Sequence, residues 1–173
     1  PLYKRIYKLV KEINPNAANK IILHKSKVPI FDQYYGLDEQ INKIIRPKVW
    51  LKSGAHLIIE HTEAMVVIDV NSGRFIGKKE HEDNSLKINI EAAKEIVRQL
   101  RLRDIGGLIV IDFIDLAEEK NRKKVYDTLR REIKIDGSKA SLSEFSDFGL
   151  LQMTRQRVGL SLLHTLTDNC KKC

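Results

Sequence analysis

The chain has 173 residues, of which 42% are hydrophobic and 31% charged, a composition typical of a globular domain and too apolar for a disordered one. Its net charge is +8, and residues 1–50 hold 10 basic but only 4 acidic residues. This excess of positive charge is compatible with a polyanion partner such as nucleic acid, and it is equally explained by solubility alone. No apolar run approaches the roughly 18 residues that a membrane span needs, so we expect no membrane span. Two cysteines cannot make a disulfide scaffold, and the first residues lack the continuous apolar core of a signal peptide.

The first part of the chain contains short elements and few apolar positions. Residues 2–13 have the spacing of an amphipathic helix that stops at Asn14-Pro15-Asn16. Residues 20–24 have the pattern of a short strand, and residues 37–45 that of a short helix ending before Pro47. We expect no independent core here, so this part should be half of a domain or rest on the part that follows.

From Val49 onward, strand patterns alternate with helix patterns. Residues 56–60 and 64–70 predict a hairpin, residues 108–113 a strand buried on both faces, and residues 139–145 a further strand. One long helix is expected between an N-cap at Asn84 and the pair Gly106-Gly107, and a second over residues 118–133. This alternation predicts an α/β fold with a mixed sheet flanked by helices.

Two of the predicted strands end in the same way, with three apolar residues followed by an aspartate. Val66-Val67-Ile68 precedes Asp69, and Ile109-Val110-Ile111 precedes Asp112. If the two strands are neighbours, their carboxylates repel each other unless a cation lies between them, and Mg²⁺ or Mn²⁺ prefers such oxygen ligands. Asn71 lies two residues after Asp69 and therefore on the same strand face. The alternative is that both are ordinary strand-end aspartates that cap loops or face water.

Basic residues form a second group of candidates. Lys139, Arg155 and Arg157 are predicted RNA-contacting residues, Arg155 and Arg157 because they follow an apolar segment at residues 148–153. The alternative is a solvated charged surface.

Cys170 and Cys173 form the only cysteine pair, with two residues between them. Their spacing suits two zinc ligands, and because a closed structural site needs four, a second copy of the chain could supply the other two. A redox dithiol or two inert thiols are the alternatives; a metal is favoured because a redox pair normally begins a helix after a strand.

Several strings resemble the ribonuclease E/G family of RNA-degrading endonucleases. They are Ile68-Asp69-Val70-Asn71-Ser72, residues 89–93 and 98–104, residues 106–115, residues 148–157, and Cys170 with Cys173. They follow the family's order over roughly residues 29–173, and residues 145–149 are more similar to the ribonuclease G branch.

The resemblance implies a subdomain organisation and a set of site residues. Residues 45–166 would form a deoxyribonuclease I-like catalytic subdomain, residues 1–44 part of a ribonuclease H-like subdomain, and residues 167–173 a zinc-link segment. Asp69 and Asp112 would bind Mg²⁺ (or Mn²⁺) with Asn71 hydrogen-bonding beside them, and Cys170 and Cys173 would share a structural Zn²⁺ between two chains.

The implied function is Mg²⁺-dependent cleavage of single-stranded RNA to 5′-phosphate and 3′-hydroxyl ends, in rRNA processing and mRNA decay in the cytoplasm. The implied partners are single-stranded RNA and a second copy of the chain, a homodimer that could assemble into a tetramer in the full-length enzyme. The family's RNA-clamping domain, 5′-end-sensing pocket and final small domain are expected to lie outside this chain. The alternative is therefore a non-catalytic RNA-binding or dimerisation fragment.

Overall fold

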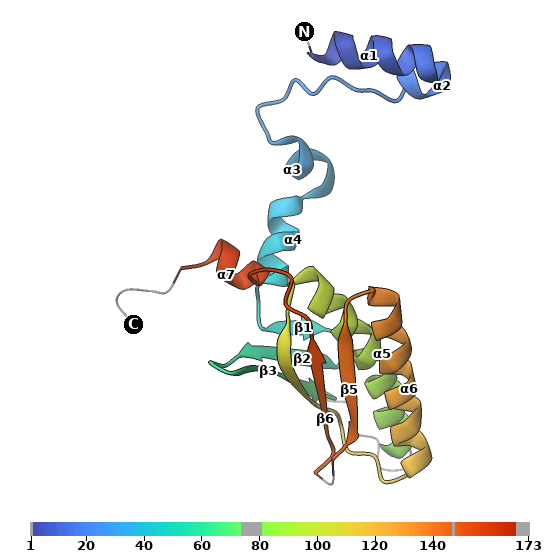
Figure 1. Ribbon diagram of the computed structural model, residues 1–173, viewed down its shortest axis with the longest axis vertical. Helices are drawn as coiled ribbons and strands as arrows, with labels where there is room; N and C mark the ends of the chain where they lie inside the picture. Colours follow the sequence, from blue (N-terminus) through green and yellow to red (C-terminus); the bar gives the residue numbers. More distant parts are fainter. Residues whose placement is uncertain (1, 74–80, 147, 169–173) are drawn as a thin grey trace. The chain divides into compact units, whose positions relative to one another are not determined.

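The computed structural model describes residues 2–73, 81–146 and 148–168, and the chain divides into two compact units, residues 1–41 and 42–173 (Figure 1). The first unit contains α1 (Leu2–Ile13), α2 (Pro15–Ala18), α3 (Ile30–Tyr35) and the beginning of α4 (Leu37–Ile44). The chain leaves α1 at Asn14 as predicted, because the side-chain oxygen of Asn14 accepts the amides of Asn16 and Ala17 and so caps α2.

The strand predicted at residues 20–24 is wrong. Lys20 lies in a turn and residues 21–24 form no regular element, because no strand among the described residues of this unit offers them a hydrogen-bonding partner. Ala18 is the only buried residue among residues 2–41. The first unit therefore has no hydrophobic core of its own in the part that the structure describes, as expected.

The second unit is built around a six-stranded sheet. Its strands are β1 (Lys48–Trp50), β2 (His56–His61), β3 (Met65–Asn71), β4 (Gly107–Asp112), β5 (Ala140–Phe145) and β6 (Leu150–Arg155). The spatial order is β1-β2-β3-β4-β6-β5, and β3 with β4 is the one parallel pair among these strands. The predicted α/β fold with a mixed sheet is confirmed.

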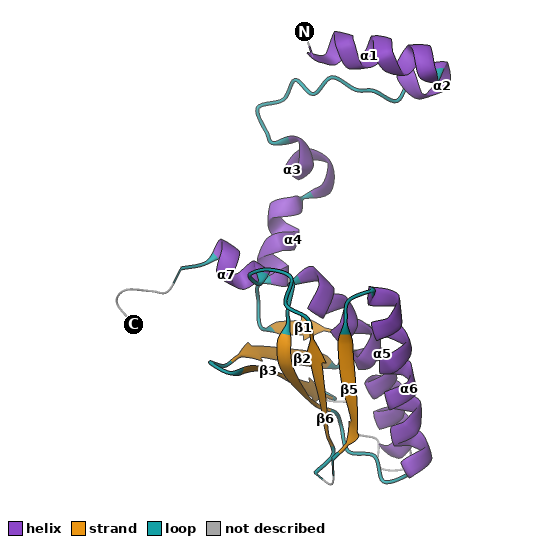
Figure 2. Ribbon diagram, viewed as in Figure 1, coloured by secondary structure: helices purple, strands orange, loops and turns teal. Residues whose placement is uncertain are grey.

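Helices α5 (His81–Leu102) and α6 (Glu119–Asp136) pack side by side on one face of this sheet (Figure 2). Alternate strand residues such as Ile68 and Ile111 point into this layer and are fully buried against α5 residues such as Ala92 and Ile96. The small side chain of Ala92 lets the helix approach the sheet closely, and the period of two along each strand puts every second residue in the core.

The opposite face of the sheet has a different composition. Val67, Asp69, Asn71 and Val110 on this face are half-buried, and Asp112 is exposed. We call this face the open face. The strand pattern therefore separates an apolar set that faces the helices from a mixed set that carries the two aspartates.

Two boundaries differ from the prediction. The long helix already includes residues 81–83, so Asn84 lies inside α5 and does not cap it. The second helix ends at Asp136, where Gly137 adopts a φ of 74°, a left-handed conformation that favours glycine. A short helix, α7 (Leu162–Leu166), follows the sheet, and none of the helices described has both the length and the apolar character needed to cross a bilayer.

Candidate functional site

The fold brings Asp69 and Asp112 together although 42 residues separate them in the chain. They are directly paired in the register between the parallel strands β3 and β4, so their Cα atoms lie at about the 4.8 Å spacing of neighbouring strands. Directly paired residues point to the same face, so both carboxylates stand on the open face, at the carboxyl end of the two strands. The carboxyl ends of neighbouring parallel strands are where α/β folds commonly place their functional residues.

Asn71 is joined to this pair by a hydrogen bond. Its side-chain amide nitrogen donates to Oδ2 of Asp69 at 2.5 Å, across the period-of-two spacing that the sequence predicted. This bond orients the Asp69 carboxylate and leaves its second oxygen for another ligand. Partners of this kind commonly fix the geometry of metal-binding carboxylates.

The electrostatics of the pair are unfavourable without a cation. Partial desolvation of its carboxyl group, and then the negative charges of Asp69 and Asp115, raise the pKa of Asp112 above its usual range although the residue as a whole is exposed. No group of three or more His, Cys, Asp or Glu side chains in the described part of the chain is arranged to hold a metal. The two carboxylates nevertheless fit Mg²⁺, which is usually bound through one or two carboxylates and completes its shell with water and substrate phosphate.

The loop that follows Asp112 is held in place by two side chains of α5. Asn89 is fully buried; its amide nitrogen donates to the carbonyl of Ile114 at 2.7 Å and its oxygen accepts the Ile114 amide at 3.1 Å. The carboxylate of Glu82 accepts the amides of Ala117 and Glu118 at the start of α6. The backbone after β4 is therefore fixed by bonds that the sequence pattern did not reveal.

His56 was not predicted to belong to the site, because the five histidines show no metal-ligand spacing. It begins β2 and pairs directly with Asn71, on the open face. Burial and then the charge of Lys48 lower the pKa of His56, and Asp69 offsets this only partly, so the neutral form of the ring is favoured. Knowledge of the β2–β3 register would have revealed this neighbour, and the sequence does not supply it.

The three basic candidates lie elsewhere. Arg155 is the residue of β6 that pairs with Gly107, at the opposite end of β4 from Asp112, and Lys139 and Arg157 flank the same end. Five residue steps along β6, from Leu150 beside Asp112 to Arg155, separate this end from the aspartates by roughly 17 Å. Lys139 and Arg157 are exposed, and the side chain of Arg157 lies against Gly106 and Gly107. The structure does not bring these cations to the carboxylate pair.

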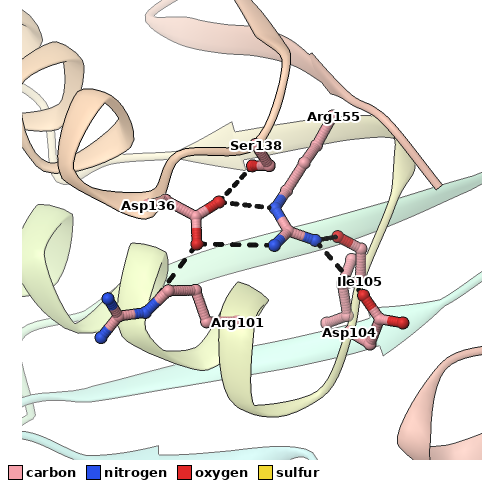
Figure 3. A network of polar contacts seen from close by, with 6 residues as sticks. All are labelled: Arg101, Asp104, Ile105, Asp136, Ser138 and Arg155. Atoms are coloured by element: carbon pink, nitrogen blue, oxygen red, sulfur yellow. Dashed lines mark hydrogen bonds and ion pairs between the residues drawn. The ribbon is translucent and has the colours of Figure 1, made fainter. Parts of the chain in front are cut away.

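Arg155 is buried, with 8% of its surface exposed, and its guanidinium is engaged by a polar network (Figure 3). Its Nε donates to Asp136 at 3.0 Å and its Nη1 to the carbonyl of Ile105 at 2.8 Å. Arg101 approaches the same Asp136 carboxylate at 3.8 Å, and the Ser138 hydroxyl donates to it. Arg155 therefore joins β6 to the end of α6, and its guanidinium is engaged inside the protein and not presented to RNA.

The predicted zinc ligands Cys170 and Cys173 lie outside the residues that the structure describes.

The fold and the site define an α/β domain that presents two carboxylates side by side on an open sheet face. The model of the Ribonuclease E/G family matches residues 1–158. Ribonuclease G of Salmonella typhimurium (strain SL1344) is 40% identical over 171 residues, which cover 99% of this chain and 35% of that protein. Ribonuclease G of Escherichia coli (strain K12) is 39% identical over the same shares, and ribonuclease E of Haemophilus influenzae is 37% identical over 99% of this chain and 18% of its own length.

The chain therefore belongs to the ribonuclease E/G family, as its motifs indicated. It spans about a third of the length of the ribonuclease G relatives that it matches.

Proposed function

We propose that this chain carries the catalytic centre of an endoribonuclease that hydrolyses single-stranded RNA with the help of Mg²⁺. The observation that carries the proposal is the in-register pairing of Asp69 with Asp112, completed by the Asn71 hydrogen bond. Membership of a family whose members are named ribonucleases, and the net charge of +8, support RNA as the substrate.

The site residues have distinct roles in this proposal. Asp69 and Asp112 hold the cation, and Asn71 keeps the Asp69 carboxylate in one orientation. A bound Mg²⁺ supplies Lewis-acid stabilisation of charge on the phosphate oxygens and lowers the pKa of a bound water. Attack of water on phosphorus with departure of the 3′ oxygen, which takes up a proton, gives the 5′-phosphate and 3′-hydroxyl ends expected from the resemblance. The raised pKa of Asp112 is consistent with a carboxylate that gains from a nearby cation.

The subdomain assignment belongs to the same proposal. Residues 45–166 would be deoxyribonuclease I-like and residues 1–44 part of a ribonuclease H-like subdomain, with the cellular roles in rRNA processing and mRNA decay that the resemblance implies. These names rest on the family's motifs, whereas the mixed sheet and its two helices rest on the structure.

Mn²⁺ binding tests the metal part directly. We expect the chain to bind one Mn²⁺ ion, measured by electron paramagnetic resonance of the free ion, and Asp112→Asn to weaken binding by about tenfold or more. Mg²⁺ should compete for the same ion site, and RNA cleavage by the full-length protein should cease when the metal is chelated. Undiminished Mn²⁺ binding by Asp69→Asn and Asp112→Asn would contradict the site. RNA binding that is indifferent to Mg²⁺, without cleavage, would favour the non-catalytic alternative.

A structural zinc site shared between two chains is a separate proposal, which rests on the spacing of Cys170 and Cys173 and on the family resemblance. We expect half a zinc ion per chain and a dimer in sedimentation, and we expect Cys170→Ser to abolish both. A monomer that keeps its zinc would rule out sharing. This outcome is independent of RNA cleavage at Asp69 and Asp112.

A further inference from the structure

Trp50 is the only tryptophan of the chain, and 64% of its surface is exposed although it lies in a strand of the sheet. A single exposed apolar side chain needs no explanation by itself. Its position relative to the carboxylate pair makes Trp50 informative.

The strand register places Trp50 in line with the candidate site. Trp50 pairs directly with His56, and His56 pairs directly with Asn71, whose side chain holds Asp69. Directly paired residues share a face, so Trp50 and His56 continue the open face outward from the carboxylates to the edge strand β1. The row next to it runs from Lys48 through Ile58 to Asp69 and Asp112.

Two neighbours give the indole the character of a nucleotide-binding surface. The ring centroids of Trp50 and His56 are 5.1 Å apart, and the Lys48 ammonium lies 4.2 Å from the centroid of the Trp50 ring. An aromatic platform beside a cation matches a nucleotide, which presents a flat base and an anionic phosphate. An exposed cation–π contact is weaker than the stacking of a base on an aromatic ring, so a base can displace Lys48 toward a phosphate.

We propose that Trp50, flanked by His56 and Lys48, stacks one nucleobase of the RNA strand whose scissile phosphate lies at Asp69 and Asp112. The proposal rests on the proposed function and adds a substrate-selecting contact to it. Bases in a duplex already stack on one another, so a platform beside the cleavage site favours unpaired RNA. Because every base has a π face, the contact selects single strands without selecting a sequence.

The test uses the full-length protein and single-stranded RNA with 2-aminopurine placed in turn at each position around the cleaved bond. The fluorescence of 2-aminopurine falls when the base stacks. We expect strong quenching at one position near the cleaved bond and its loss in Trp50→Leu. Trp50→Phe, which keeps an aromatic ring, should retain most of it. Ile135→Ala is the matched control, because Ile135 is 65% exposed and lies on α6, away from the open face.

Cleavage kinetics separate this contact from the catalytic centre. We expect Trp50→Leu to raise KM about tenfold with little change in kcat. An abasic residue at the quenched position should raise the KM of the wild-type protein equally and that of Trp50→Leu no further.

Unchanged KM and fluorescence in Trp50→Leu would overturn the proposal. It would also be overturned by equal losses on intact and abasic RNA together with a lower melting temperature, which would indicate that another segment of the protein packs on Trp50. In both cases Asp69→Asn would still abolish cleavage, whereas full cleavage by Asp69→Asn would refute the proposed function instead.

Discussion

Replacing either paired aspartate by asparagine, as Asp69→Asn or Asp112→Asn, should lower the rate of RNA cleavage by at least about a hundredfold. Asparagine has nearly the same shape and can still accept hydrogen bonds, but it removes the negative charge that a divalent cation needs. Cleavage of a labelled single-stranded RNA at saturating Mg²⁺, by the full-length protein, measures the effect. Asn71→Ala should lower the rate of RNA cleavage about 10–100-fold, since Asn71 acts by orienting Asp69.

The same substitutions should leave the protein folded. The two carboxylates repel each other, and partial desolvation and the charge of Asp69 raise the pKa of Asp112, so its ionised form opposes folding in the metal-free protein. Asp112→Asn should therefore keep or slightly increase the melting temperature without metal. Glu60→Gln is a matched control, because Glu60 is an exposed carboxylate on neighbouring β2 and pairs with Val67. Near-normal cleavage by both aspartate variants would refute the assignment.

Asp136→Ala should destabilise the protein by about 3–5 kcal/mol, the largest stability effect that we expect from a single polar side chain. The Asp136 side chain is 4% exposed and that of Arg155 is 7% exposed. The substitution removes the carboxylate that lies nearest to this buried guanidinium, which keeps the Ile105 carbonyl at 2.8 Å and the more distant Asp104 carboxylate at 3.6 Å (Figure 3). Urea unfolding measures the change. Arg155→Met should also lower the free energy of unfolding. The double variant should lose less stability than the sum of the losses in the two single variants.

The surface pair of Lys120 and Glu118 provides the control for this prediction. Its charged atoms are 2.8 Å apart, closer than those of the buried pair, but the two side chains are 72% and 48% exposed. Lys120→Ala should therefore have little measurable effect on unfolding. An equal loss from Lys120→Ala and Asp136→Ala would show that burial does not determine the contribution of these pairs.

The Asp136 contribution should also depend on pH in a defined direction. Burial alone would raise the pKa of Asp136, but hydrogen bonds from Arg155 and Ser138 and the charges of Arg155 and Arg101 outweigh it and leave the pKa lowered. The stabilisation is therefore fully present above the unfolded-state pKa of about 3.9 and is lost as the pH falls through the lower folded-state value. The stability difference between wild type and Asp136→Asn should shrink as the pH falls below about 4. A difference that grows with acidity would contradict this.

Local sequence patterns determined most of the secondary structure and the identity of the paired aspartates. Strands β3 and β4 and helices α5 and α6 follow from residues two, three or four positions apart, and the repeated apolar-apolar-apolar-Asp ending marks Asp69 and Asp112 without any structure. The strand predicted at residues 20–24 failed because a strand also needs a partner, and the pattern of one segment does not supply it.

Only the tertiary structure decided which distant residues meet. The sequence predicts Arg155 as an RNA-contacting residue, yet the structure buries its guanidinium between β6 and the end of α6, against Asp136, which lies 19 residues earlier in the chain. Trp50 and His56 have no motif, and the register of β1, β2 and β3 is what aligns them with Asn71. Helix and strand periodicity depends on residues that are neighbours along the chain, so it can be predicted from the sequence. Strand register and ion pairing depend on how segments far apart in the chain pack together, so they cannot.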